Sequence, residues 1–417
     1  MRAGPLRRDC DDMPGALSHL RVLDLSRVLA GPWAAQNLAD LGADVIKVER
    51  PGRGDDTRAW GPPFIENPDG SAGDSGYFAS VNRGKRSVTI DIASPRGQAL
   101  VRQLAAEADV LIENYKVGTL ERYGLGYAAL SALNERLVYC SVTGFGQHGP
   151  YAHLPGYDFV FQGMGGIMSY TGAPDSQAGG GPAKVGMAIV DAVTGMYATI
   201  AIMAALEHRH ASGRGQYIDL GLLDCAVALN SYHAVNYFLT GSVPARVGNA
   251  HPHMVPYNLF DCADGQVILA IGNDTQFASF CRAAGRPALA DDPDFATVTG
   301  RQLHRDRLVP AVAEVMRERT MKAWFDLLGE ANVPCGPVYS MAQVFDDEQV
   351  RERAMRQELR RADGQAVSVT ANPIRLSETP VGYALAPPHL GQHTDEVLRE
   401  LGVTAQDIAA LRRDGIV

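Results

Sequence analysis

An aspartate in a glycine-rich segment is the first feature of the sequence with chemical potential. Glycine is dense over residues 143–186, which disfavours regular structure and suits loops whose backbone approaches a ligand closely. Asp175 follows Pro174 inside this segment. By local pattern alone, such an aspartate is most often a turn residue. The segment is nevertheless where we expect a site, because a carboxylate there could act as a nucleophile.

The common cofactor motifs are missing from the sequence. The first strand-to-helix turn reads Ser26 to Pro32 and lacks the GxGxxG pattern of dinucleotide-binding proteins. Neither the GxxxxGK[ST] phosphate loop nor the GxSxG nucleophile motif occurs. His251 and His253 flank a proline without a further ligand pattern, which is weak support for a metal. The sequence therefore predicts no nicotinamide cofactor and no metal.

The composition is that of a soluble globular protein. The 417 residues are 46% apolar and carry a net charge of −9, which argues against a nucleic-acid partner but permits local cationic sites for anions. The cysteines have no CxxC spacing, so we expect reduced thiols in a cytoplasmic protein. They are Cys10, Cys140, Cys225, Cys262, Cys281 and Cys335.

Two segments could be mistaken for targeting or membrane signals. Residues 1–16 lack the apolar core of a signal peptide, and we expect a disordered leader there, or sequence upstream of a start at Met13. Residues 185–206 are long and apolar, but Asp191 lies among them and glycines interrupt them. A charge at that depth is costly in lipid, so we expect a buried helix and no membrane partner.

The elements that must position a site alternate between strands and helices. Apolar strands are predicted near 22–25, 45–48, 87–92, 110–112 and 137–142, with helices near 31–41 and 95–107 between them. This order is typical of βαβ units and a mainly parallel sheet. Further helices are predicted near 187–210, 222–240, 275–284, 305–331, 394–401 and 405–413, with a strand at 216–220, a hairpin over 257–271 and a strand near 366–369.

Eight motifs in order along the chain resemble the class III CoA-transferase family, also called CaiB/BaiF. They are LRVLDLSRVLAGP at 20–32, LGADVIKVE at 41–49, NRGKRS at 82–87, ENY at 113–115, TGFG at 143–146, GRGQ at 213–216, PCGPV at 334–338 and LGQHT at 390–394. The resemblance implies an α/β fold: a Rossmann-like parallel-sheet domain built from both chain ends, a smaller inserted α+β domain, and an interlocked homodimer. The corresponding division is 1–16, 17–224, 225–330 and 331–417, with a linker helix at 187–210.

The resemblance also implies site residues. Asp175, in the TGAPD motif, would be the catalytic nucleophile, although the residues that follow it depart from the family's usual Gly-Pro-Pro. Coenzyme A or acyl-CoA would be a substrate and not a permanently bound cofactor. The residues expected to bind it are Val28, Leu29, Ala30, Arg50, Asn114, Arg122, Gly144, Phe145 and Gly146. Lys47 and Arg86 are weaker candidates for the CoA phosphates.

The implied reaction moves CoA between carboxylic acids through an aspartyl-CoA thioester. Leu29 replaces a glutamine of some oxalate-handling members, and GNAHPHMVPY at 248–257 replaces their glycine run. Both differences favour a succinate- or glutarate-type dicarboxylate.

Two other functions stay open. A 2-methylacyl-CoA racemase of the same family would need a histidine where Tyr157 stands, next to Asp158, and an aspartate near Asp191. A non-catalytic CoA-ester-binding protein is the second alternative.

Overall fold

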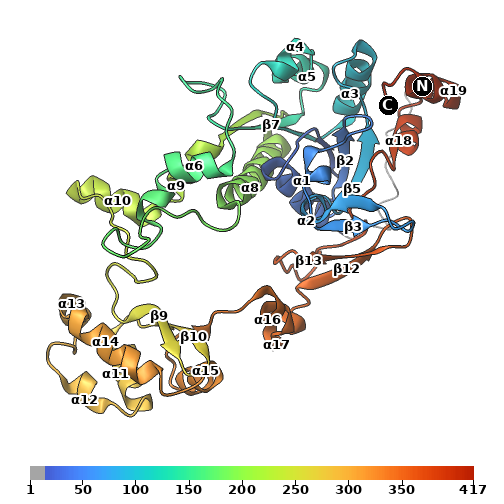
Figure 1. The fold of residues 1–417 in the computed structure, drawn as a ribbon. Helices are drawn as coiled ribbons and strands as arrows, with labels where there is room; N and C mark the ends of the chain where they lie inside the picture. Colours follow the sequence, from blue (N-terminus) through green and yellow to red (C-terminus); the bar gives the residue numbers. More distant parts are fainter. Residues whose placement is uncertain (1–14) are drawn as a thin grey trace. The chain divides into compact units, whose positions relative to one another are not determined.

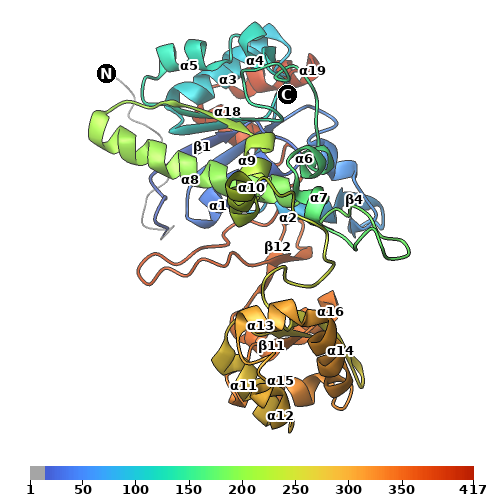
Figure 2. The ribbon, with the colours of Figure 1, turned by 90° about the vertical axis from the view of Figure 1, so that its left-hand side faces the viewer.

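Residues 15–417 are described by a computed structural model, which divides into two compact units (Figures 1 and 2). Of the described residues, the first unit combines 15–167, 185–232 and 351–417, and the second combines 168–184 and 233–350. The predicted domain boundaries near 225 and 330 stay predictions. The predicted leader at 1–16 lies almost wholly outside the described residues.

The first unit is built on a six-stranded sheet in the order β5-β2-β1-β6-β7-β8, with all pairings parallel. The predicted parallel α/β sheet is thereby confirmed. The strands are β1 (Arg21–Asp24), β2 (Asp44–Glu49), β5 (Lys85–Thr89), β6 (Val110–Glu113), β7 (Val138–Thr143) and β8 (Tyr217–Gly221).

Alternate side chains of these strands feed two separate cores, as the period of two in a strand requires. Val22 and Val45 face α1 (Ala30–Asp40) and α8 (Ile189–Ser212), which Figures 1 and 2 both show side by side. Leu23 and Ile46 face the opposite layer. That layer contains α3 (Pro95–Glu107), α5 (Tyr127–Leu133), α18 (Thr394–Glu400) and α19 (Ala405–Arg413).

Shorter elements complete the first unit. They are η2 (Asp56–Ala59), β3 (Phe64–Glu66), β4 (Ala72–Ser75), α2 (Gly76–Ser80), α4 (Thr119–Arg122), α6 (Asp158–Met164), α9 (Leu222–Ala228), β12 (Arg356–Arg360) and β13 (Ala366–Thr370). The short helix α7 (Ile167–Tyr170) begins in the first unit and continues into the second. The helix predicted over 222–240 is wrong as one element. It is split into α9 and α10 (Ser231–Thr240), and Ser231, the first residue of α10, has a left-handed φ of 46°.

The second unit has its own core around an antiparallel sheet in the order β11-β10-β9. Its largest fully buried side chain is Trp324, whose indole N–H donates to the carbonyl of Met316 at 2.7 Å. The elements are β9 (Tyr257–Cys262), β10 (Gly265–Ala270), α11 (Asp274–Ala283), α12 (Pro287–Asp291), α13 (Val298–Leu303), α14 (Arg305–Met316), α15 (Met321–Glu330), β11 (Cys335–Pro337), α16 (Met341–Asp346) and α17 (Glu348–Glu352).

Candidate functional site

The turn between β1 and α1 lies where the strand order of the large sheet reverses. β2 follows on one side of β1, whereas β6 lies on the other. In open α/β sheets, ligands bind in the crevice that such a reversal leaves at the carboxyl ends of the strands. Asn114, just after β6, accepts the backbone N–H of Arg27 at 2.8 Å and donates to its carbonyl at 2.6 Å. Asn114 therefore ties together the loops after the two central strands.

Within this turn, Val28 has a left-handed φ of 71°, which is unusual for a β-branched residue. Its N–H donates to both carboxylate oxygens of Asp55, at 3.3 Å each. Leu29 comes next and is buried, and Ala30 begins α1. Three of the residues predicted to bind CoA thus form one constrained turn.

Buried charges lie beneath the turn. Lys47 contacts Asp55 at 3.0 Å and donates to the carbonyl of Ser26 at 2.8 Å. Lys85 contacts Asp24 at 2.8 Å and donates to the carbonyl of Pro32 at 2.9 Å. All four charged side chains are fully buried. Burial outweighs the attraction of Asp24 and lowers the pKa of Lys85 to about 8.

The predicted cationic residues fall into two groups. Arg50 and Arg122 are exposed, as residues that meet CoA phosphates must be. Lys47 is enclosed by Asp55, whereas Arg86 is bound by Asp44 at 2.6 Å and Glu400 at 2.7 Å. Lys47 and Arg86 are therefore committed to internal carboxylates, and the structure gives them no surface for a CoA phosphate.

The loop after β7 contains the predicted residues Gly144, Phe145 and Gly146. A Cβ on Gly144 would lie 2.8 Å from the ring of Phe161, so the close approach requires glycine. The ring of Phe145 packs edge-on against Phe161 at 5.1 Å, and Gly146 has a left-handed φ of 80°. This loop leaves β7 at the same carboxyl edge of the sheet as the turn at Val28.

Two acidic side chains, Asp158 and Asp191, lie at the start of α8. Asp158 accepts the backbone N–H groups of Val190 at 2.7 Å and Asp191 at 3.1 Å, and so caps that helix. Burial and the nearby charge of Asp158 raise the pKa of Asp191 to about 7, although a hydrogen bond from the Ala30 backbone opposes the shift. Asp191 is therefore a partly buried carboxyl held against the N-terminus of α1.

Tyr77 interacts electrostatically with this carboxyl, and Trp60 packs on Tyr77. Burial, together with the charges of Asp191, Asp158 and Asp55, raises the pKa of Tyr77 to about 12. The ring of Tyr77 packs edge-on against Trp60 at 5.3 Å, and Trp60 is 41% exposed. Sequence reasoning missed both aromatic residues. No local signal marks them, because the fold alone brings Tyr77 under the influence of Asp191.

Asp175 belongs to the second unit. Its side chain is 77% exposed and forms an ion pair with Arg246, which also donates to the carbonyl of Ser169 at 3.0 Å. The same loop is fixed where the Gly248 N–H donates to the Gly172 carbonyl at 3.1 Å. Asp175 is therefore an accessible, ion-paired aspartate on a loop that is hydrogen-bonded within its own unit.

Within the described part of the chain, the structure contains neither a metal-binding cluster nor an unambiguous membrane span. Over residues 15–417, no group of three or more His, Cys, Asp or Glu side chains is placed to hold a metal ion. One helix, α8, is long and apolar enough to cross a membrane, but 44% of its most apolar window is buried in the protein. The core helix of a soluble protein passes the same test, so this length is weak support for a span.

Known proteins resemble the chain over most of its length. Residues 17–394 match the model of CoA-transferase family III. An Agrobacterium fabrum protein named succinate–glutarate CoA-transferase is 49% identical, covering 94% of this chain and 97% of the relative. A Mus musculus protein named succinyl-CoA:glutarate CoA-transferase is 41% identical, covering 95% and 89%. The crystal structure of a CAIB/BAIF family protein from Brucella suis has a TM-score of 0.83 at 44% identity, covering 93% and 100%.

Proposed function

The chain belongs to CoA-transferase family III, and from that premise we propose that it transfers CoA from an acyl-CoA to a carboxylic acid through an aspartyl-CoA thioester. The observation that carries the proposal is the carboxyl of Asp191. It lies against the backbone of Ala30, and Ala30 is one of the residues that the family resemblance assigns to CoA binding. A carboxylate beside a thioester can attack its carbonyl carbon directly.

The bonds exchange in four steps. The aspartate attacks the donor carbonyl, the carbon–sulfur bond breaks, and a mixed anhydride and a CoA thiolate result. The thiolate attacks the aspartyl carbonyl, releases the donor acid and leaves an aspartyl-CoA thioester. The acceptor carboxylate attacks that thioester and regenerates an anhydride and the thiolate. The thiolate then attacks the acceptor carbonyl, which yields the new acyl-CoA and the free aspartate.

The chain's own backbone supports this chemistry at Asp191. Each attack on the aspartyl carbonyl places negative charge on its oxygen, which preorganised N–H donors stabilise. The Ala30 N–H, at the N-terminus of α1, is such a donor, and a helix N-terminus favours negative charge.

Two aspartates are candidates for the nucleophile. The TGAPD motif predicts Asp175, and that assignment stays a prediction. Asp191 has more structural support, because it is partly buried and hydrogen-bonded at the turn, whereas the side chain of Asp175 is 77% exposed and paired with Arg246. A thioester on a sheltered residue is protected from hydrolysis by water. We therefore propose Asp191 as the nucleophile and retain Asp175 as the alternative.

One experiment decides between them. The wild-type protein, Asp191→Asn and Asp175→Asn are incubated with succinyl-CoA and then treated with hydroxylamine or borohydride, and the peptides are weighed by mass spectrometry. We expect modification at Asp191, and no transfer to glutarate by Asp191→Asn. Modification at Asp175, with transfer abolished in Asp175→Asn, would reverse the assignment. Full transfer by both variants would overturn the aspartyl intermediate.

For the acids, we propose a dicarboxylate pair of the succinate and glutarate type. The names of the relatives from Agrobacterium fabrum and Mus musculus support this choice, as does Leu29 in place of the glutamine of oxalate-handling members. A panel of succinyl-CoA, acetyl-CoA and glutaryl-CoA donors against C2 to C6 acids tests it, with each CoA ester identified by mass.

The racemase alternative has less support. The position of the required histidine is taken by Tyr157, whose side chain points largely into solvent, with 67% of the residue exposed. Exchange of an α-deuterium in a 2-methylacyl-CoA without an acceptor acid would favour it. Binding of acyl-CoA with neither exchange nor transfer would instead favour a non-catalytic binding protein.

We further propose that the protein is a cytoplasmic homodimer. A run on α8 is exposed although it is apolar: Met196, Tyr197, Ile200 and Met203 are 38–62% exposed. None of the ten residues of α10 is buried, and Phe238 and Leu239 are each 78% exposed. Contiguous exposed apolar surfaces of this kind mark protein interfaces.

A further inference from the structure

The unusual conformation of Val28 has an identifiable cause. A valine at a φ of 71° is strained, and strain of this kind persists only where the surroundings over-determine it. The Val28 N–H donates to both oxygens of Asp55. The position of the Asp55 carboxylate therefore sets the path of the backbone two residues before Ala30.

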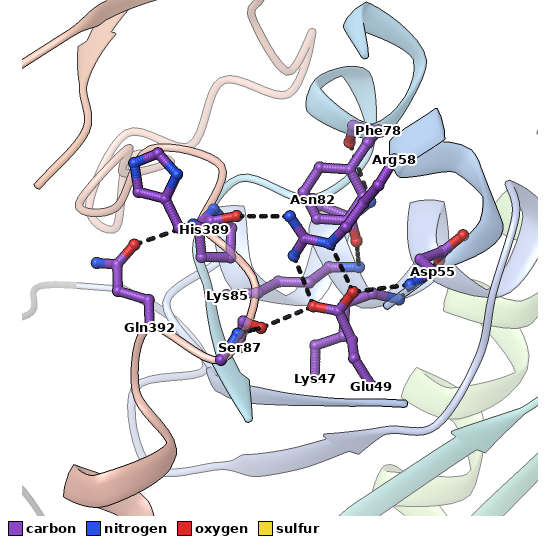
Figure 3. Close-up of polar contacts among 12 residues, drawn as sticks. Lys47, Glu49, Asp55, Arg58, Phe78, Asn82, Lys85, Ser87, His389 and Gln392 are labelled. Atoms are coloured by element: carbon purple, nitrogen blue, oxygen red, sulfur yellow. Dashed lines mark hydrogen bonds and ion pairs between the residues drawn. The ribbon is translucent and has the colours of Figure 1, made fainter. Parts of the chain in front are cut away.

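Asp55 is itself held by contacts through both of its carboxylate oxygens and its backbone N–H. One oxygen pairs with Lys47 at 3.0 Å, while the other accepts the N–H and the hydroxyl of Thr57 at 3.0 and 2.8 Å. The Asp55 N–H donates to Glu49 at 2.9 Å, and Glu49 in turn binds Arg58 at 2.6 Å, as Figure 3 shows. Lys47 adds a second contact to the turn through the Ser26 carbonyl.

Stability alone is a poor explanation for this arrangement. A buried ion pair contributes little compared with apolar side chains of the same volume, because both charges lose their hydration. What the Lys47–Asp55 pair does supply is a fixed orientation of the turn's backbone. Its atoms fix Ser26 and Val28, and the next helical residue, Ala30, bonds Asp191.

We propose that Lys47 and Asp55 are positioning residues that hold the turn at 26–30 so that the Ala30 N–H stays on the Asp191 carboxyl. The proposal rests on the function assigned above to Asp191. Both side chains are fully buried, so they act through the backbone of the turn and not by contact with a substrate.

The test is Asp55→Asn in the full-length protein. The new amide presents a donor where an oxygen now faces Lys47 or Val28, so one contact is lost. We expect kcat for CoA transfer to fall by roughly tenfold to a hundredfold, the size that small misplacements produce. KM for succinyl-CoA should change by less than about threefold, because no substrate contact is removed. Hydrogen exchange of the peptide covering residues 26–30 should become faster.

A pH profile separates positioning from general destabilisation. The Ala30 hydrogen bond lowers the pKa of Asp191, so its loss should move the midpoint of the rate profile to higher pH. The other groups that act electrostatically around this carboxyl, Asp158 on α6 and Tyr77 on α2, are unchanged in the variant.

Asp40→Asn is the matched control. Asp40 binds Arg83 through two hydrogen bonds of 2.8 and 2.6 Å, in an equally buried pair of the same unit. The Asp40→Asn variant should lose about as much stability as Asp55→Asn, while its kcat and the midpoint of its pH profile stay unchanged. If Asp55→Asn does not fold, Lys47→Gln/Asp55→Asn removes both charges together and should show the same fall in kcat.

The outcomes are distinguishable. A folded Asp55 variant with wild-type kcat and pH midpoint would overturn the positioning role, as would an equal effect of Asp40→Asn. Failure of the wild-type protein to transfer CoA would instead refute the proposed function.

Discussion

Oδ1 of Asp158 lies 3.1 Å from the backbone nitrogen of Asp191 and accepts its N–H. Two acidic side chains thus meet at the N-terminus of α8, one as the cap and the other with a pKa raised to about 7 by burial and by its neighbour. Because Asp158 accepts the backbone N–H of Asp191, it fixes the backbone position from which the Asp191 side chain extends.

The rate of CoA transfer should rise with pH through about 7. Only the ionised form of Asp191 is a nucleophile, and its pKa is raised to about 7. Initial rates of glutaryl-CoA formation between pH 5.5 and 8.5 measure the midpoint. Glu113, buried on β6, also has a pKa raised to about 7. Glu113→Gln is therefore the control, and its rate should still rise with pH through about 7. If the rate of that variant no longer rose with pH, the pH dependence would belong to Glu113.

Asp191→Asn should be more stable than the wild-type protein at pH 8. Because the folded state holds the Asp191 proton more tightly than the unfolded chain does, stability falls as pH rises from about 4 to about 7. Above that range the ionised carboxylate costs up to about 4 kcal/mol, from the raised pKa. Urea unfolding at pH 8 should therefore show the gain, and at pH 4 the two proteins should differ little. A loss of stability at pH 8 would contradict the buried-charge reading.

Val28→Gly should lower activity without lowering stability. Glycine adopts the left-handed conformation freely and relieves strain of about 1–3 kcal/mol, while its greater freedom in the unfolded chain offsets part of that gain. We expect a melting temperature equal to or above that of the wild type, together with a reduced kcat. Val48→Gly, at a buried strand position, is the contrasting variant and should lower both. An unchanged kcat in Val28→Gly would show that CoA transfer does not require the constrained backbone of the turn.

Arg50→Ala and Arg122→Ala should weaken binding of acyl-CoA. Both side chains are exposed, and each lost charge-assisted hydrogen bond to a phosphate costs about 1.5 kcal/mol, or roughly tenfold in affinity. KM for succinyl-CoA should rise while KM for glutarate stays constant. Arg317→Ala removes an exposed arginine of the second unit that pairs with Glu314 and should change neither constant. An unchanged KM for succinyl-CoA would exclude the arginine from CoA binding.

Ile200→Glu should change the oligomeric state. Ile200 is 62% exposed in the middle of the apolar run on α8, and a charge there would be costly to bury in an interface. Light scattering after gel filtration should give a dimer mass for the wild type and a lower mass or soluble aggregates for the variant. Glu207→Gln on the same helix is the control. A monomeric wild type would refute the dimer.

Much of the sheet could be predicted from the sequence, because a buried parallel strand is recorded locally as a short apolar run. Val110 to Ile112 and Val138 to Val142 are examples. The pairing of charges could not be read in this way. Lys47 and Arg86 resemble phosphate ligands in the sequence. The carboxylate partner of Lys47, however, is Asp55 at the start of η2, and Arg86 pairs with Asp44 on another strand and with Glu400 far along the chain.

The chemistry near Asp191 was equally hidden. The sequence drew attention to Asp175 because its loop is conspicuous, whereas Asp191 stands inside an apolar helical run where an acidic residue has no local explanation. Only the contacts with Ala30 and Asp158 give it one.

The return of the chain to the large sheet has a consequence for synthesis on the ribosome. Val417 is buried, the Asp91 N–H donates to the carbonyl of Ile416 at 2.7 Å, and α18 packs on β5. The outer strand β5 therefore stays uncovered until α18 and the residues up to 417 have been synthesised. Because segments fold during translation only once all their parts have emerged, this layer closes late. A chain truncated near residue 390 would lack the contacts of His393 and Thr394 with β5 and would have an open sheet edge.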